Sequence, residues 1–202
     1  MLDLKREWFK SQERFIGKTL GKMPITPNQW TVLSIIFALA GLYFTINLDF
    51  LWAFIMFFVA GILDFVDGSV ARAKNMSSNT GAYIDTVVDR YVEGIMLLGL
   101  FFVQLPEIIL PASVWIFLAL FGSIVTTYAK AAAKEKDLVN QELKGGLMSR
   151  GERIILIFAI FILLIFSQAY IATIILIAIA VLANFTALQR FFSAINLNLK
   201  KN

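Results

Sequence analysis

Four aspartates carry the most distinctive chemistry in this sequence. Asp64 and Asp67 are three residues apart, and Asp85 and Asp89 are four residues apart. Both spacings place the two carboxylates of a pair on one face of a helix. The short connection at residues 72–80 should make the two helices antiparallel neighbours, so the four carboxylates are expected to face one another. Carboxylates gathered in this way repel each other unless a cation lies among them.

The residue types that the chain lacks exclude several kinds of catalytic and metal-binding site. The sequence contains no cysteine and no histidine, which excludes thiol nucleophiles, Cys/His zinc sites and Ser-His-Asp triads. A cluster of oxygen ligands alone selects Mg²⁺, Mn²⁺ or Ca²⁺. Two such ions about 3.5–4 Å apart form the clamp that is used in phosphoryl transfer, and a nucleotide diphosphate could complete their coordination.

Small residues share the helix faces of the aspartates. Gly68, Ala71 and Gly81 would let a ligand approach the backbone closely, and Arg72 could bind phosphate. Tight packing between helices is an alternative explanation for the three small residues. Packing does not explain the aspartates, because a charge within an apolar segment is costly.

The elements that must position these residues are apolar helices. Of the 202 residues, 59% are hydrophobic, well above the roughly 45–50% of soluble domains. Spanning a bilayer takes about 20 predominantly apolar residues. The apolar tracts predict an all-α, polytopic membrane protein with six transmembrane helices at about residues 27–46, 50–71, 81–104, 111–134, 153–167 and 169–193.

Local signals support these boundaries. The last uncharged tract, residues 154–189, is too long for one crossing and should turn near Ser167. Capping boxes are expected to begin at Thr26 and at Ser149, each at the start of a predicted helix.

Positive charge indicates the orientation of the chain. The eighteen lysines and arginines fall into four blocks, and the six-helix arrangement places all four blocks on one side of the membrane. The positive-inside rule then predicts an integral protein of the cell membrane, with both termini and the aspartates in the cytoplasm. Because topology accounts for the basic residues, nucleic-acid binding is not indicated.

The first 22 residues differ from the rest. They are too short for a span, and apolar residues such as Trp8 and Phe9 are mixed with basic ones. This pattern predicts an interfacial amphipathic helix on anionic membrane lipids. Residues 23–202 would then form the transmembrane domain.

The aspartates are part of a longer motif. It reads Asp64-Phe-Val-Asp67-Gly68-Ser-Val-Ala71-Arg72, then eight residues, then Gly81-Ala-Tyr-Ile-Asp85-Thr-Val-Val-Asp89. This segment resembles the signature of the CDP-alcohol phosphotransferase family, D-x2-D-G-x2-A-R-x8-G-x3-D-x3-D, at every fixed position. Members of that family transfer a substituted phosphate from a CDP-linked donor to an alcohol and release CMP.

The resemblance implies a role for each of these residues. The four aspartates would hold two divalent ions, Mg²⁺ or Mn²⁺, and Asp89 would also be the general base for the acceptor hydroxyl. Asn28 and Thr31 match a frequent P-N-x-x-T element of the family, although helix capping also explains them. The residues expected to bind the CDP group are Asn28, Thr31, Asp64, Asp67, Gly68, Ala71, Arg72, Gly81 and Asp85.

The resemblance also suggests an acceptor. The chain is similar to the inositol-phosphate-using members, which carry Y-x-K-A-R-A-E and then G-G…E-R-P-E-R-L. It departs from the first element at Ala132 and Lys134, and from the second at Ser149 and Gly151. Inositol 1-phosphate is the implied acceptor, and the residues expected to bind its phosphate are Lys130, Arg150, Arg153 and Arg190.

Several alternatives stay open at this point. The acceptor could be glycerol 3-phosphate, serine or another polar alcohol, and the donor could carry diacylglycerol, archaeol or no lipid. Lys130 and Arg190 could instead reach lipid head groups. A cation transporter also uses carboxylates, but it would place them near the midplane and often shows an inverted repeat, and this sequence has neither feature. The resemblance further implies a homodimer.

Overall fold

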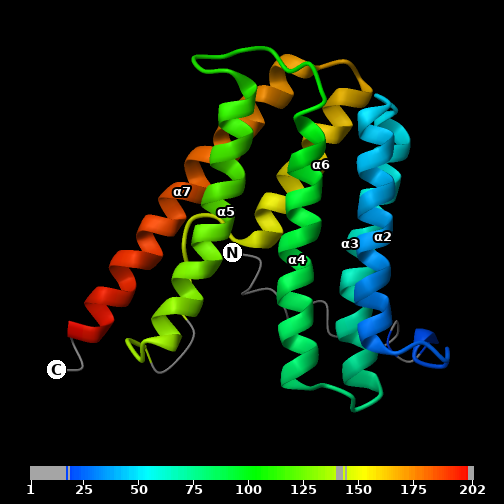
Figure 1. The fold of residues 1–202 in the computed structure, drawn as a ribbon, viewed down its shortest axis with the longest axis vertical. Coiled ribbons are helices and arrows are strands. Elements are labelled where there is room, and N and C mark those ends of the chain that lie inside the picture. The colour runs from blue at the N-terminus through cyan, green and yellow to red at the C-terminus, as the bar shows by residue number, and fades with distance from the viewer. Residues whose placement is uncertain (1–16, 18, 140–142, 144, 200–202) are drawn as a thin grey trace. The chain divides into compact units, whose positions relative to one another are not determined.

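The computed structural model describes residues 17, 19–139, 143 and 145–199 (Figure 1). Within these residues the regular elements are α-helices and there is no β-strand, which confirms the all-α prediction. The predicted amphipathic helix lies largely outside the described residues. The helices are α2 (Pro27–Ile46), α3 (Phe50–Ala73), α4 (Asn79–Leu100), α5 (Ala112–Glu135), α6 (Arg150–Ile165) and α7 (Ala169–Leu199).

Side-chain caps explain where two of the helices begin. At the start of α2, the Thr26 backbone N–H donates to Gln29 Oε1 at 2.8 Å, and the Gln29 N–H donates to the Thr26 hydroxyl at 3.4 Å. Ser149 and Glu152 make the same reciprocal pair before α6. Each box satisfies two backbone donors that a helix terminus otherwise leaves open. Both predicted capping boxes are therefore confirmed.

Four helices end in a common backbone motif. At Ser167, which has φ 57°, the N–H bonds to the carbonyl of Leu164, and the next N–H, of Gln168, bonds to the carbonyl of Leu163. This is the Schellman arrangement, formed here without glycine. The residues in the equivalent left-handed position after α2, α3 and α5 are Leu48, Asn75 and Asp137. The predicted turn near Ser167 is thus confirmed.

The helix predicted at residues 81–104 ends earlier than expected. It spans Asn79–Leu100, because the N–H groups of Phe101, Phe102 and Val103 bond to carbonyls three residues back. Such bonds tighten the chain into a turn well before the prolines that were expected to stop the helix. At the other end of the chain, α7 continues past the predicted residue 193 to Leu199.

The first of two compact units, Met1–Val103, contains α2, α3 and α4. Helix α2 packs against both α3 and α4, whereas α3 and α4 touch each other little. Gly41 permits the close approach of α2 and α3, since a Cβ there would lie 2.7 Å from the Phe57 ring. The expected antiparallel pair is therefore held together mainly by α2, which leaves room between α3 and α4 for polar side chains.

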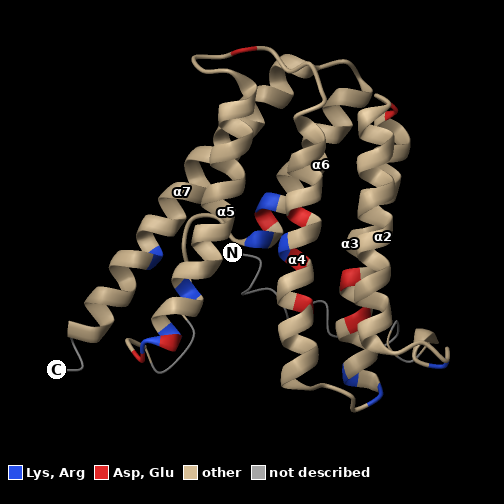
Figure 2. Ribbon diagram, viewed as in Figure 1, with Lys and Arg blue, Asp and Glu red and all other residues tan. Residues whose placement is uncertain are grey.

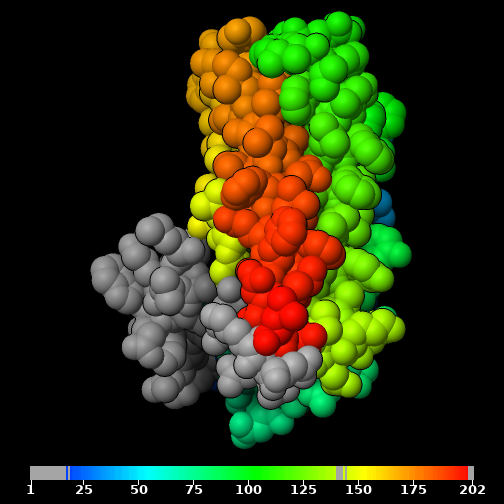
Figure 3. Space-filling model, turned by 90° about the vertical axis from the view of Figure 1, so that its left-hand side faces the viewer, coloured from blue at the N-terminus to red at the C-terminus, as the bar shows by residue number. Residues whose placement is uncertain are grey.

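The second unit, Gln104–Asn202, contains α5, α6 and α7. Helices α5 and α7 lie side by side along their length (Figures 1 and 3). Polar side chains join them, because Thr126 Oγ1 donates to the Ala183 carbonyl at 3.0 Å and Asn184 Nδ2 donates to the Leu118 carbonyl at 2.8 Å. Hydrogen bonds of this kind are typical of helix pairs in membranes.

The composition of the helices indicates an integral membrane protein. Four of the described helices, α2, α3, α5 and α7, are long and apolar enough to cross a bilayer. Helix α4 carries several charged residues, and α6 has 16 residues, which corresponds to a length of about 24 Å. In the first unit, the charged residues of α3 lie toward the end that its loop joins to α4, whereas those of α4 extend from Asp85 near its start to Glu93, past its middle (Figure 2).

Candidate active site

The carboxyl end of α3 is fixed to the start of α2. Lys74 Nζ donates to the carbonyl oxygens of Met23 at 3.0 Å and Ile25 at 3.2 Å, directly before the Thr26 cap. A lysine at the end of a helix can stay near its own helix dipole while it binds a neighbouring chain segment. The first turn of α2 is thereby held beside the last turns of α3.

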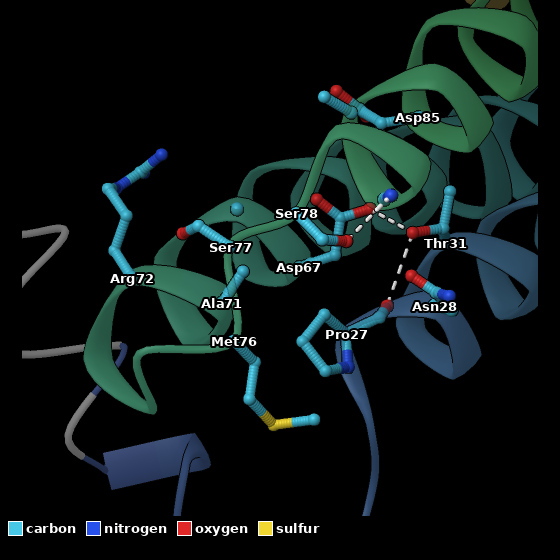
Figure 4. A pocket seen from close by; sticks show the side chains of 13 residues that line it. Pro27, Asn28, Thr31, Asp67, Ala71, Arg72, Met76, Ser77, Ser78 and Asp85 are labelled. Atoms are coloured by element: carbon cyan, nitrogen blue, oxygen red, sulfur yellow. Dashed lines mark hydrogen bonds between the residues drawn. The ribbon is translucent and has the colours of Figure 1, made fainter.

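A buried hydrogen bond crosses this junction. Thr31 Oγ1, one turn into α2, donates to Asp67 Oδ2 on α3 at 2.5 Å, and it also lies 3.2 Å from the Pro27 carbonyl oxygen (Figure 4). Asp67 is 5% exposed, so its carboxylate depends on such a donor in place of water. The sequence indicated both residues, but it could not show that they bind each other.

The first turn of α4 completes the same wall. Ser78 caps this helix by accepting from the Gly81 N–H at 3.0 Å. A Cβ at Gly81 would lie 3.2 Å from Ser78 Oγ and 3.6 Å from Asn28 Oδ1. The amino-terminal ends of α2 and α4 therefore meet here, and the positive ends of their dipoles favour an anion.

These three elements enclose a pocket in the first unit (Figure 4). All the residues predicted to bind CDP line it except Asp64. At its edge, the Arg72 guanidinium folds over Gly68, where an added Cβ would lie 3.3 Å from Nη1. Arg72 is exposed and can bind a phosphate from this position. The remaining lining residues are Pro27, Met76, Ser77, Ser78 and Ala82.

Three of the four aspartates gather beside the pocket. One carboxylate oxygen from each of Asp64, Asp85 and Asp89 lies within 4.8 Å of the others. Oxygen ligands on opposite sides of a Mg²⁺ ion are about 4.2 Å apart, since each bond is about 2.1 Å long. The cluster therefore fits a divalent ion after small side-chain movements. Asp67 is not in this group among the described residues; instead it shares the pocket with Asp85.

Comparison with known proteins identifies the family. Residues 24–185 match the family model for CDP-alcohol phosphatidyltransferases. The chain belongs to this family. Over 196 residues it is 32% identical to the archaetidylinositol phosphate synthase of Pyrococcus horikoshii, and the match covers 96% of both chains. The resemblance seen in the sequence is thus confirmed, and the protein is a membrane transferase of phospholipid biosynthesis.

Solved structures show the same fold. The phosphatidylinositol phosphate synthase of Mycobacterium tuberculosis with CDP-DAG bound superimposes with a TM-score of 0.77 at 21% identity, covering 90% of this chain and 92% of that one. The same enzyme in complex with manganese and citrate gives a TM-score of 0.78 at 22% identity, covering 90% and 88%. At this identity, the similarity concerns the arrangement of the helices.

In this family member, two further charged residues lie beside Asp89. Arg90 Nη2 is 3.3 Å from Asp89 Oδ2, and Arg90 Nη1 is 3.7 Å from Glu93 Oε2. Glu93 is 1% exposed. Neither residue was predicted to belong to the site, although Glu93 continues the four-residue spacing of Asp85 and Asp89 and could have been found from it.

The residues predicted to bind the acceptor all belong to the second unit. Arg190, on α7, donates from Nη1 to the Thr126 carbonyl at 3.0 Å and from Nε to the Gly145 carbonyl at 3.4 Å. Lys130 is half-buried near the end of α5. Arg150 and Arg153 lie in the first turns of α6, where Arg153 is buried.

The loop before α6 is fixed to α7. Gly145 and Gly146 have φ values of 100° and 110°, a region that favours glycine. Beyond them, the Leu147 N–H donates to Gln189 Oε1 and the Met148 N–H donates to Thr186 Oγ1, both at 3.0 Å. The G-G element thus determines where α6 begins, and with it the position of the first arginines on that helix.

Proposed function

We propose that the protein transfers a lipid-linked phosphate from a CDP-lipid to inositol 1-phosphate and releases CMP. One observation carries this proposal. Asp85 belongs both to the pocket at the ends of α2, α3 and α4 and to the group of three carboxylates. A donor whose nucleotide occupied the pocket would therefore place its pyrophosphate beside the candidate metal ligands.

The pocket suits the CDP part of the donor. Two helix amino termini and Arg72 offer positive potential to the pyrophosphate. Gly68, Ala71 and Gly81 have little or no side chain, so they leave space in the pocket for the nucleotide. Asn28 and Thr31 lie in the first turns of α2, where Asn28 can bind the nucleotide directly and Thr31 supports Asp67. Asp64 and Asp85 would take part through the metal site.

The family depends on divalent metals, and we propose that they bind the carboxylates of Asp64, Asp85 and Asp89, which lie close together, with Asp67 also lining the neighbouring pocket. We propose two ions, Mg²⁺ or Mn²⁺. Bound ions would neutralise the donor pyrophosphate and stabilise the departing CMP. A related enzyme of the same fold has been solved with manganese, which agrees with this donor set of hard oxygen ligands.

Asp89 is proposed as the general base. Asp89 is buried and contributes to the carboxylate group. In the reaction, the acceptor hydroxyl oxygen forms a bond to the lipid-side phosphorus of the donor, the bond from that phosphorus to the bridging oxygen breaks, and Asp89 accepts the hydroxyl proton. CMP leaves with the bridging oxygen. One displacement of this kind needs no covalent enzyme intermediate.

Two observations support the proposed acceptor: the cationic residues of the second unit and the name of a relative. Four cations, Lys130, Arg150, Arg153 and Arg190, come from three helices of that unit, and guanidinium groups bind phosphate in a bidentate way. The relative from Pyrococcus horikoshii is named an archaetidylinositol phosphate synthase, which favours a phosphorylated inositol over glycerol 3-phosphate or serine.

The membrane arrangement completes the proposal. All six helices would cross the membrane as one domain, residues 23–202, including the charged α4 and the short α6. Residues 1–22 would lie on the cytoplasmic surface of the cell membrane as an amphipathic helix. The active site and both termini would face the cytoplasm, and two copies of the chain would form a homodimer.

The function can be tested with purified protein in detergent. CDP-diacylglycerol and CDP-archaeol are each incubated with Mg²⁺ or Mn²⁺ and a panel of alcohols, and CMP and the new lipid are measured by mass spectrometry. We expect CMP only when metal and acceptor are both present, and the fastest release with inositol 1-phosphate. Release with glycerol 3-phosphate alone would reject the acceptor, and absence of CMP with every alcohol would reject the transfer itself.

A further inference from the structure

Helix α4 carries a row of three carboxylates. Asp85, Asp89 and Glu93 follow one another at intervals of four residues, so they lie on one helix face over about 12 Å. Asp85 and Asp89 belong to the carboxylate group, whereas Glu93, one turn further along, is outside that group among the described residues. Divalent ions held by the group would therefore not balance the charge of Glu93 directly.

Arg90 supplies a countercharge between Asp89 and Glu93. Its Nη2 lies 3.3 Å from Asp89 Oδ2 and its Nη1 lies 3.7 Å from Glu93 Oε2. The side chain of Glu93 is 2% exposed, and those of Asp89 and Arg90 are 12% and 22% exposed. Such ion pairs are poorly screened by water, so their geometry strongly restricts the side chains involved.

The geometry explains why arginine is needed at this position. Adjacent residues on a helix point about 100° apart, yet Arg90 contacts both the preceding residue, Asp89, and Glu93, three residues further along α4. Its planar guanidinium can then present separate N–H groups to two carboxylates. Lysine, as a single point charge, could not hold both carboxylates in fixed orientations.

We propose that Arg90 and Glu93 are positioning residues that act through Asp89. Glu93 orients the guanidinium of Arg90, and Arg90 holds Oδ2 of Asp89, so that the carboxylate keeps one orientation toward the metal and the acceptor hydroxyl. This inference rests on the proposed function, because it gives Asp89 the roles of ligand and base. Residues that orient a metal ligand commonly affect metal affinity or activity by about 10–100-fold when they are changed.

The central test is a paired substitution, Arg90→Gln with Glu93→Gln. A single change would remove one charge of a buried ion pair and could prevent folding, whereas the paired change removes both charges of the pair together. We expect the double variant to fold, as judged by size-exclusion chromatography and thermal unfolding, with kcat about 10–100-fold lower and an almost unchanged KM for the CDP-lipid. A double variant with the kcat of the original protein would overturn the proposal.

A second measurement separates positioning from a merely structural role. Mn²⁺ affinity is measured by titration calorimetry for four proteins: the original, the double variant, Asp89→Asn, and the combination of all three changes. If the pair acts through Asp89, the double change weakens Mn²⁺ binding several-fold when Asp89 is present and by less than about twofold in the Asp89→Asn background. Equal weakening in both backgrounds, or none in either, would overturn the proposal.

The exposed ion pair of Glu135 and Lys136 provides a matched control. Its atoms are 3.1 Å apart and its side chains are 68% and 71% exposed, so Glu135→Gln with Lys136→Gln makes the same change of charge away from the pocket. We expect this variant to retain both kcat and Mn²⁺ affinity. An original protein that neither releases CMP nor binds Mn²⁺ would reject the proposed function, whereas active protein with a fully active double variant would reject only the positioning role.

Discussion

The hydroxyl of Thr31 is the clearest case of a single group on which the pocket depends. It lies 36 residues from Asp67 in the sequence, and it donates to that carboxylate at the buried junction of α2 and α3. A hydrogen bond to a charged group contributes about 1.5–3 kcal/mol, and a buried carboxylate that loses its donor also loses solvation that water cannot restore. Thr31 thus controls the orientation of a pocket carboxylate without needing to touch the substrate.

The first prediction concerns removal of the Thr31 hydroxyl. Thr31→Val keeps the shape of the side chain and removes the donor, and we expect the KM for the CDP-lipid to rise on the order of tenfold or more, as the energy of a charged hydrogen bond implies. Thr31→Ser retains the donor and should stay close to the original protein. Steady-state CMP release at varied donor concentration measures the effect, and equal KM values for the valine and serine variants would contradict it.

Gly81 gives a second prediction, which concerns space in the pocket. A Cβ in Gly81→Ala would enter the region between Ser78 and Asn28, so we expect weaker donor binding. Alanine is a better helix former than glycine by about 1 kcal/mol, so the thermal unfolding temperature should not fall.

The neighbouring change Thr80→Ala is the control for Gly81→Ala, because Thr80 is exposed and does not line the pocket. The donor KM of both variants is compared by CMP release. If Gly81→Ala bound the donor as well as Thr80→Ala does, the nucleotide would not lie against the first turn of α4.

At the scale of helices, the sequence predicted those helix starts and turns that depend on residues close together in the chain. The capping boxes at Thr26 and Ser149 and the turn near Ser167 involve residues within a few positions of each other, and all three are confirmed. The end of α4 was misplaced, because backbone bonds after Leu100 stop the helix before any proline does. Schellman ends at residues such as Leu48 carry no glycine, so composition alone does not reveal them.

The same difference between local and long-range contacts decides which parts of the candidate site could be predicted. The aspartate spacing identified the residues of the motif, but long-range partners such as Thr31 and Asp67 depend on how α2 packs on α3. Glu93 was not predicted because it lies outside the motif, which ends at Asp89. Its pairing with Arg90 is local and could have been inferred from the three-residue spacing.

The loop before α6 gives a prediction at this scale, with two adjacent glycines as a matched pair. Both have positive φ, but a Cβ at Gly146 would collide with Thr186 Cγ2, whereas a Cβ at Gly145 would meet nothing within 4 Å. Gly145→Ala therefore costs backbone strain alone, about 1–3 kcal/mol. Gly146→Ala adds a clash with α7.

We expect Gly146→Ala to lower the thermal unfolding temperature clearly more than Gly145→Ala does. The comparison is made on the two purified variants under the same detergent conditions. Because the loop sets the start of α6, Gly146→Ala should also raise the acceptor KM more than the donor KM. Identical unfolding temperatures for the two variants would show that the loop is not held against Thr186 in solution.

At the scale of the whole molecule, charge and length together determine how the chain lies in a bilayer. Four of the described helices are long and apolar enough to cross by themselves, and in the proposed arrangement α4 and α6 cross as well. A charged α4 can cross when its carboxylates face protein and metal rather than lipid. The residues proposed to perform the chemistry thus make α4 the least lipid-like of the long helices.

The absence of cysteine from the sequence allows this topology to be tested by introducing one thiol at a time. Six crossings with a cytoplasmic amino terminus place Asn47, Glu107 and Gln168 outside and Thr80 and Lys136 inside, and all five are exposed. In intact cells, a membrane-impermeant maleimide should label the cysteine variants at the first three positions and should label the other two only after the membrane is opened. If α4 did not cross, Glu107, Lys136 and Gln168 would all change sides, and if α6 alone did not cross, only Gln168 would, while Asn47 between α2 and α3 would keep the external labelling in both cases.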